Sequence, residues 1–147
     1  MKKEILHAYL AGLIDGEGTI TITKEKANSK FKMPVVSVAS TTIELLNAFV
    51  NNYGGVISNK KLYKEHHKPS FSWRLTNQKA LILLNDVLPY MLEPVKIYRA
   101  KLLISSYNKL TSRNGKYTET QIKNKLEFEH LFFHPSGSID NMSLATL

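Results

Sequence analysis

The segment LHAYLAGLIDGEGTI, residues 6–20, constrains the fold of this chain more than any other stretch. It begins with apolar and small residues whose spacing predicts a helix from about Lys3 to Ile14. Two carboxylates, Asp15 and Glu17, follow between glycines, and the alternating run TITITK then predicts a half-buried strand. The segment therefore predicts a helix that ends in acids immediately before a strand.

The rest of the chain predicts the order helix, two strands, helix, two strands and then helices. Strands are expected at 19–24, 31–40, 56–64 and 70–76, and further helices at 41–55, 77–87, 95–110 and 118–133. Thr41 with Glu44, and Thr118 with Gln121, predict capping boxes. Because the strands of each pair are closely linked, we expect an antiparallel four-stranded sheet and an α+β class. One domain is expected over residues 1–134, with a loosely held tail over residues 135–147.

Composition limits the classes of function. Twenty Lys and Arg residues against twelve Asp and Glu give a net charge of +8 and a pI near 9.6, a balance that favours nucleic acid as a partner. The chain has no cysteine, which excludes disulfides and thiolate metal sites and fits the cytoplasm or an organelle. No apolar run reaches the ~18 residues of a membrane span, so no membrane partner is expected.

The first helix has two apolar faces on a helical wheel. One face carries bulky side chains and is expected in the core: Leu6, Tyr9, Leu10 and Leu13. The other is narrower and carries short side chains: Ala8, Ala11, Gly12 and Asp15. Short side chains at this spacing permit a second helix to approach closely, and no other segment offers a matching face. We therefore expect the same helix of a second copy there, across a two-fold axis. The simpler interpretation is a core helix with a charged last turn.

A dimer of this kind would bring the acids of two helices side by side. Such a concentration of negative charge is unfavourable without a counter-ion, and Mg²⁺ is the usual choice where phosphates complete the shell. Two roles are open for Asp15: metal binding, or accepting backbone N–H groups at the end of the neighbouring helix, which we favour. Glu17 is the favoured metal ligand, with the Gly16 carbonyl as a further oxygen.

The nine residues LAGLIDGEG, residues 10–18, resemble the signature of the LAGLIDADG homing endonucleases and differ from it only at Gly16 and Glu17. The resemblance implies the αββαββα fold, and a single motif implies a homodimer. It implies a Mg²⁺-dependent endodeoxyribonuclease, encoded in an intron or intein, that breaks both strands of a long, partly palindromic DNA target. Mn²⁺ or Ca²⁺ would substitute in binding.

The resemblance also assigns roles to residues. Glu17 matches the acid that binds the catalytic metal, Gly16 the residue whose carbonyl assists it, and Asp15 the acid that caps the partner helix. Glu17 is one methylene longer than the usual Asp, a change that the family accepts. The stretch EPVKIYRAK is similar to the segment with a basic residue near the scissile phosphate, which would be Lys96. A polar residue at the end of the second strand is expected at Ser40 or Ser37.

The sheet is the expected DNA-reading surface. A two-stranded ribbon fits the major groove, and ten strand residues at ~3.3 Å each span about ten base pairs. The expected DNA-binding residues are Thr19, Thr21, Thr23, Lys24, Lys26, Lys30, Lys32, Ser40, Lys60, Lys61, Tyr63, Lys64, Ser70, Ser72 and Arg74. Trp73 alternates with Ser72 and Arg74 and is expected in the core.

Two other functions fit the same fold and charge. One is an RNA-binding maturase that helps its host intron to splice, and the other is a DNA-binding protein with an inactive site. Glu17, Gly16 and Lys96 together argue against the inactive protein, since a pure binder has no need of an acid beside phosphate. His130 and His134 have a zinc-like spacing, but without a third ligand we do not expect zinc there.

Overall fold

The computed structural model of the chain describes residues 1–60 and 68–135. Within these residues the chain forms five α-helices, one short 3-10 helix and four strands, which confirms the predicted α+β class. The elements are α1 (Lys3–Glu17), β1 (Gly18–Lys24), β2 (Lys32–Ser40), α2 (Ile43–Tyr53), β3 (Val56–Asn59), β4 (Phe71–Thr76), α3 (Asn77–Val87), η1 (Leu88–Tyr90), α4 (Pro94–Leu110) and α5 (Glu119–Phe133). No helix in the described part of the chain is long and apolar enough to cross a membrane.

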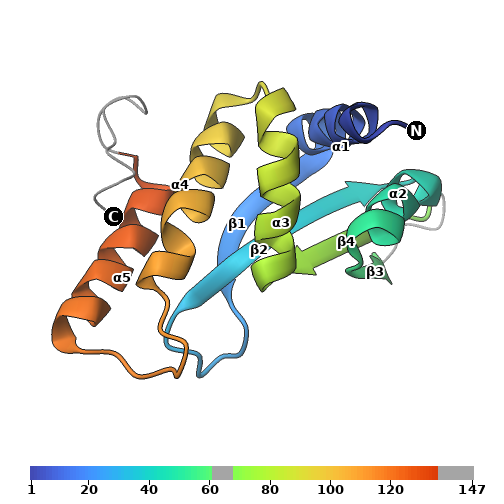
Figure 1. The fold of residues 1–147 in the computed structure, drawn as a ribbon. Coiled ribbons are helices and arrows are strands. Elements are labelled where there is room, and N and C mark those ends of the chain that lie inside the picture. Colours follow the sequence, from blue (N-terminus) through green and yellow to red (C-terminus); the bar gives the residue numbers. More distant parts are fainter. Residues whose placement is uncertain (61–67, 136–147) are drawn as a thin grey trace.

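The four strands form one antiparallel sheet in the order β1-β2-β4-β3, so β1 and β3 are its edges. The helices cover one face of this curved sheet (Figure 1). Strand β2 pairs with β1 from its first residue, but it pairs with β4 only from Val35 onward. Residues 22–24 and 32–34 therefore extend beyond β4 as a two-stranded ribbon.

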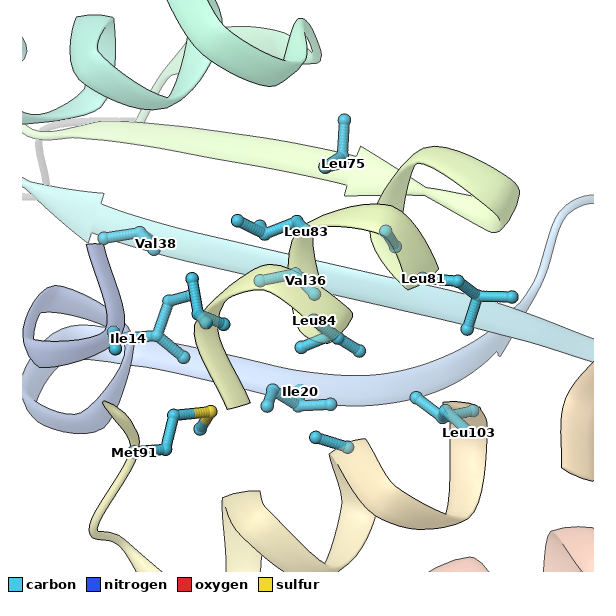
Figure 2. Close-up of a cluster of buried hydrophobic side chains, with 14 of the residues drawn as sticks. Ile14, Ile20, Val36, Val38, Leu75, Leu81, Leu83, Leu84, Met91 and Leu103 are labelled. Carbon is cyan, nitrogen blue, oxygen red and sulfur yellow. The ribbon is translucent and has the colours of Figure 1, made fainter. Parts of the chain in front are cut away.

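The hydrophobic core fills the space between the sheet and the helices. Figure 2 shows Ile20 and Val36 of neighbouring strands close to Leu84 of α3, with Leu103 of α4 nearby. The predicted alternation in β1 is confirmed, because Ile20 and Ile22 are buried whereas the threonines between them are not. Burial of these alternate side chains is what fixes which face of the ribbon is exposed.

Trp73 is a core residue, as predicted. Its ring is fully buried and stacks on Phe49 with 4.4 Å between ring centroids. The indole N–H donates a 2.9 Å hydrogen bond to the Gly54 carbonyl, so burial leaves the donor satisfied. A Cβ at Gly55, which has φ +91°, would lie 2.5 Å from this indole nitrogen, so only glycine fits the turn before β3.

The predicted orientation of helix α1 is right for Leu10 and for Leu6 and Leu13, which pack against the core, but wrong for Tyr9 and Ala11. Its buried residues are Leu10, Ala11 and Ile14, whereas Tyr9, expected in the core, is 43% exposed. The physical reason is that α1 is apolar almost all round, so the wheel alone does not decide which side faces the sheet. Ala11 lies on the core side because a short side chain lets the helix lie close to the elements beneath it.

Helix starts are predicted with mixed success. Thr118 and Gln121 form the expected capping box at the start of α5. At α2 the predicted box at Thr41 is wrong: the N-cap residue is Thr42, and the Ser40 hydroxyl accepts the Thr42 N–H at 3.0 Å. A residue that closes the preceding strand therefore supplies the side-chain oxygen for this turn.

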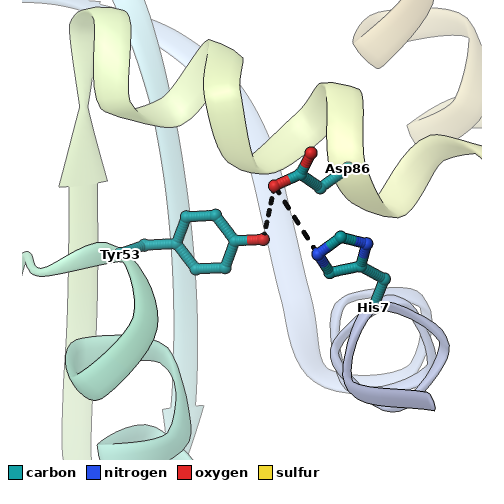
Figure 3. Close-up of polar contacts among 3 residues, drawn as sticks. All are labelled: His7, Tyr53 and Asp86. Atoms are coloured by element: carbon teal, nitrogen blue, oxygen red, sulfur yellow. Dashed lines mark hydrogen bonds and ion pairs between the residues drawn. The ribbon is translucent and has the colours of Figure 1, made fainter. Parts of the chain in front are cut away.

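A polar contact joins three helices at the end of the sheet that carries α1 (Figure 3). Asp86 of α3 accepts a 2.7 Å hydrogen bond from the Tyr53 hydroxyl of α2, and His7 of α1 lies 3.7 Å from the same carboxylate oxygen. Burial and the bond to the carboxylate raise the pKa of Tyr53. The contact ties α1 to α2 and α3, and so helps to fix the helix that carries the acidic motif.

Candidate functional site

The site is built around the junction between the end of α1 and the start of α4. The Asp15 carboxylate accepts hydrogen bonds from the backbone N–H groups of Leu92 (2.9 Å) and Glu93 (3.2 Å), immediately before α4. In return, the Lys96 ammonium of α4 donates to the carbonyls of Ile14 (2.9 Å) and Asp15 (2.8 Å). Each helix end thus receives a side chain of opposite charge to its dipole from the other helix.

The role expected for Asp15 is therefore right in kind and wrong in partner. It does accept backbone N–H groups at a helix start, but that helix is α4 of its own chain rather than α1 of a second copy. The sequence distance between these residues, 77 and 78 positions, explains why residue patterns alone did not reveal the contact. Both carboxylate oxygens of Asp15 are engaged, so Asp15 is poorly suited to bind a metal.

Glu17, in contrast, is exposed at the last position of α1. The next residue, Gly18, enters β1 so close to the helix that a Cβ there would lie 2.8 Å from the Ile14 Cα. This tight turn leads the chain directly from the acid into the first strand. A single exposed carboxylate fits Mg²⁺, which binds through one or two carboxylates when phosphates supply further oxygens. In the described residues no three His, Asp or Glu side chains gather into a complete metal site.

A hollow of about 430 Å³ opens beside this acid, between the free edge of β1 and the start of α4. Its lining carries two cations and one acid: Lys96, Arg99 and Glu93. Glu93 is the N-cap of α4 and accepts the Lys96 backbone N–H at 2.7 Å. The hollow is therefore more basic than acidic.

Arg99 is the residue of this hollow that the sequence interpretation missed. Its Nη1 donates a 2.9 Å hydrogen bond to the Ile20 carbonyl, and its guanidinium lies 5.0 Å from the centre of the Phe132 ring. Its Nε is buried without a hydrogen-bond partner among the described residues. The available signal was its spacing, since Arg99 follows Lys96 by three positions and shares its helix face.

The small-residue face of α1 differs from its prediction at Ala11, in addition to Asp15. Ala8 and Gly12 are exposed, and a Cβ added at Gly12 or Gly16 would meet no atom within 4 Å. Ala11 is buried in its own subunit, so its assignment to an interface is wrong. The exposed side of α1 also carries Ile5 and Tyr9, which are 55% and 43% exposed.

The uncovered face of the sheet carries polar side chains at the expected alternate positions. The cross-strand register places Thr19 beside Ser37, and Ser37 beside Arg74. Arg74 Nη2 donates a 3.2 Å hydrogen bond to Thr23 Oγ1, so the arginine reaches over β2 from β4 to β1. Ser72 pairs with Ser58 on the same face.

Other described residues predicted to bind DNA do not lie on the uncovered face of the sheet. Ser40 has the strand parity of buried Val36 and Val38, and its hydroxyl is engaged at the start of α2, whereas the alternative Ser37 has the outward parity. Lys32 lies on the helix side, with Nζ 4.9 Å from the Phe133 ring centre. The other lysines predicted to bind DNA that the structure describes are exposed, at the ribbon tip or after β3: Lys24, Lys26, Lys30 and Lys60. Ser70 is half-buried next to β4. Lys61, Tyr63 and Lys64 fall outside the described residues.

The Lys and Arg side chains of the described residues form no ion pairs with acids. Over residues 1–60 and 68–135, no Lys or Arg side-chain nitrogen lies within 4.0 Å of a carboxylate oxygen, and the single ion pair is that of His7 with Asp86. A net charge of +8 is thus presented to the surroundings rather than neutralised within the chain. Such a surface favours a polyanion.

Solved structures with the same fold are homing endonucleases. The structure of I-CvuI in complex with the I-CreI target has a TM-score of 0.62 and 20% identity, covering 88% of this chain and 78% of that one. The archaeal intron-encoded I-Vdi141I complexed with DNA has a TM-score of 0.57 and 18% identity, over 99% and 93%. I-CeuI complexed with DNA has a TM-score of 0.59 and 18% identity, over 91% and 69%. At these identities the likeness concerns the fold.

Membership of a family follows from the sequence. The family model described as LAGLIDADG endonuclease matches residues 10–107, about two thirds of the chain. The chain therefore belongs to the LAGLIDADG endonuclease family, which confirms the resemblance seen in residues 10–18. No match was found among curated protein sequences.

Proposed function

We propose that this protein is a site-specific DNA homing endonuclease that uses Mg²⁺ to break both strands of a long, partly palindromic target. The observation that carries the proposal is the exposed Glu17 carboxylate at the end of α1, one residue before the hollow lined by Lys96 and Arg99 and before the strand that borders the polar sheet face. An exposed acid next to a basic hollow is suited to hold a metal against a phosphate. Family membership supports DNA cleavage as the activity.

The sheet would bind DNA through its uncovered face. A two-stranded ribbon fits the major groove, where Arg74 has the geometry to contact guanine and threonine hydroxyls can contact either base type. The exposed lysines at the ribbon tip would contact phosphates, which positions the duplex without reading its sequence. Because β1 starts directly after Glu17, binding along this strand places the acid next to the DNA backbone.

Glu17 would hold the metal together with DNA phosphate oxygens, with the Gly16 carbonyl nearby. When bound, Mg²⁺ supplies Lewis-acid stabilisation of the phosphate and lowers the pKa of a bound water. Lys96 has a third ammonium proton beyond its two bonds to α1 carbonyls, and this donor would offset charge on the phosphate. I-CvuI was determined with the I-CreI target in the presence of 2 mM Mg, with the DNA not cleaved, and this use of a divalent ion is consistent with the proposed role.

A homodimer would supply two such sites for the two strands. The exposed side of α1 favours this assembly, since Gly12 and Gly16 leave room for a second backbone while Ile5 and Tyr9 offer apolar area. The two-fold axis would then pass near the ends of both α1 helices. Each Glu17 would lie close to the axis, next to one scissile phosphate.

The test is a cleavage assay with duplex DNA that spans the intron-free insertion site, in Mg²⁺ and in EDTA. We expect a double-strand break in Mg²⁺ only, and a loss of at least about a thousandfold in rate for Glu17→Gln with DNA binding retained. Glu44→Gln, an exposed acid on α2, is the matched control and should cleave normally. Tight binding of intron RNA without any DNA cleavage would instead favour a maturase.

A further inference from the structure

The last helix, α5, contacts the segment that carries β1, β2 and their connecting loop, residues 18–40, which we term the reading ribbon. Glu129 of α5 accepts a 3.0 Å hydrogen bond from the backbone N–H of Lys32, at the first residue of β2. The Lys32 ammonium in turn lies 4.9 Å from the ring centre of Phe133, one helical turn further along α5. These contacts join residues almost one hundred positions apart.

Two more contacts extend the attachment toward both ends of the ribbon. Near the tip, the Phe31 ring packs edge-on against Tyr117 with 4.8 Å between centroids, and Lys125 of α5 lies 5.9 Å from the same ring. Near the acid, Arg99 joins the Ile20 carbonyl of β1 to the Phe132 ring of α5. Helix α5, together with Tyr117 before it and Arg99 of α4, therefore supports the ribbon from Ile20 to Phe31.

The ribbon needs this support because its outer part has no other strand to pair with. Residues 22–24 and 32–34 pair only with each other, since the β2–β4 ladder begins at Val35. An isolated two-stranded hairpin is marginally stable in water and free to twist. Glu129 binds at the outer end of this overhanging part, at Lys32 next to the loop, on the helix side of the sheet.

A small rotation of this overhang about its junction with the sheet would matter for base recognition, and a contact at its outer end restrains that rotation. Three strand residues at ~3.4 Å each make an overhang of about 10 Å before the loop. A swing of about 10° would move its end by about 2 Å, whereas a hydrogen bond to a base tolerates a displacement of only about 0.5 Å. The orientation of the overhang thus decides which base edges its side chains reach.

We propose that α5 sets the base preference of the reading ribbon and that Glu129 is the positioning residue through which it does so. The proposal rests on the proposed function and adds a specificity determinant that touches no DNA. Because β1 leads away from Glu17, the ribbon tip lies farthest from the cleavage point. The base pairs affected are therefore the outer ones of each half-site.

The experiment measures specificity position by position. The wild-type protein first selects a target from a random pool of DNA duplexes, and each base pair of that target is then varied singly. For Glu129→Ala we expect discrimination to fall about tenfold at the outer positions, with the central positions and the cleavage rate on the selected target unchanged within about twofold. Glu129→Gln retains an acceptor oxygen and should restore the wild-type profile.

Glu127→Ala is the matched control, since Glu127 is an exposed acid on the same helix. If Glu129→Ala does not fold, Glu129→Asp withdraws the acceptor by one methylene and should give the same local loss. An unchanged profile, or a loss spread equally over all positions, would overturn the proposal, because either result assigns Glu129 no positional effect. A wild-type protein that cleaves no selected duplex would contradict the proposed function itself, which distinguishes the two failures.

Discussion

Lys125 offers the sharpest test of how this fold is stabilised, because it is a lysine buried among aromatic rings. It is only 1% exposed, its ammonium lies 4.2 Å from the Tyr107 ring centre, and its hydrogen-bond partner is the Thr111 hydroxyl. Burial lowers the pKa of Lys125 from 10.5 to about 8, with Glu129 acting weakly in the opposite direction. At neutral pH the folded chain therefore holds a charge in an unfavourable environment.

The pKa difference sets the size of the expected effect. A displacement from 10.5 to about 8 corresponds to about 3 kcal/mol of unfavourable charging in the folded state. Lys125→Met keeps a long, flexible side chain and removes this cost. It also removes one hydrogen bond, worth about 1 kcal/mol, while the Thr111 hydroxyl keeps its bond to the Tyr107 carbonyl. We expect Lys125→Met to raise the free energy of unfolding by about 2 kcal/mol at pH 7.

The sign of the pH dependence follows from the lowered pKa. Between about pH 8 and pH 10.5 the unfolded chain keeps a proton on Lys125 that the folded chain has lost. The stability contributed by this residue therefore rises with pH over that window, and it is flat below it because both states are protonated. The advantage of Lys125→Met should shrink through the same window, vanish within it and become a disadvantage of about 1 kcal/mol at its upper end, where the neutral amine keeps its hydrogen bond without a charging cost.

The assay is guanidinium unfolding of both proteins at several pH values from 7 to 10.5. Other titrating groups are common to the two proteins, so they cancel when the free energies are subtracted. Lys123→Met, on the exposed side of α5, is the matched control and should show neither a gain nor a pH-dependent difference. A destabilised Lys125→Met protein at pH 7, or a difference independent of pH, would refute the reasoning.

Three further predictions concern the ends of α1. Asp15→Asn replaces one of two engaged oxygens with a donor that faces a backbone N–H. It should therefore lower the free energy of unfolding, measured in urea titrations, by about 2 kcal/mol. A change below about 0.5 kcal/mol would contradict the role of Asp15 at the start of α4. Gly12→Ala should stabilise the isolated chain by about 0.5–1 kcal/mol, because its Cβ meets nothing in its own subunit. It should nevertheless weaken self-association measured by sedimentation. An equally tight dimer would count against the α1 interface. Gly18→Ala places a Cβ 2.9 Å from the Ile14 carbonyl oxygen and should lower the melting temperature clearly, and an unchanged melt would show that the turn relaxes.

Much of the fold could be predicted because its signals are local. The Ile and Thr alternation of β1 identifies a half-buried strand, and the Thr118 and Gln121 pair marks the start of α5 before any contact is known. The motif at residues 10–18 is equally local, which is why the family could be identified from nine residues. Each of these signals needs only neighbours in sequence and the period of a helix or strand.

The parts that could not be predicted depend on distant contacts. The exposed and buried sides of α1 are both apolar, so only the packing of the sheet and α3 distinguishes Ala11 from Ala8. In the sequence Lys32 resembles the other basic residues of the ribbon, but its side chain lies on the helix side of the sheet, against α5. Arg99 has no distinctive neighbours in sequence, and its importance is visible only where the edge of β1 meets α5.

The two acids of the motif have different roles: Asp15 stabilises the structure, and Glu17 is the acid proposed for the chemistry. Asp15 lies where α4 begins, and the positive end of that helix engages its carboxylate. The negative end of α1 would repel a second acid, but Lys96 covers two of its carbonyls and offsets that charge. Lys96 therefore makes an exposed acid at this helix end less unfavourable. Replacement of Lys96 should for this reason change the electrostatic environment of Glu17, even though the two side chains are not in contact.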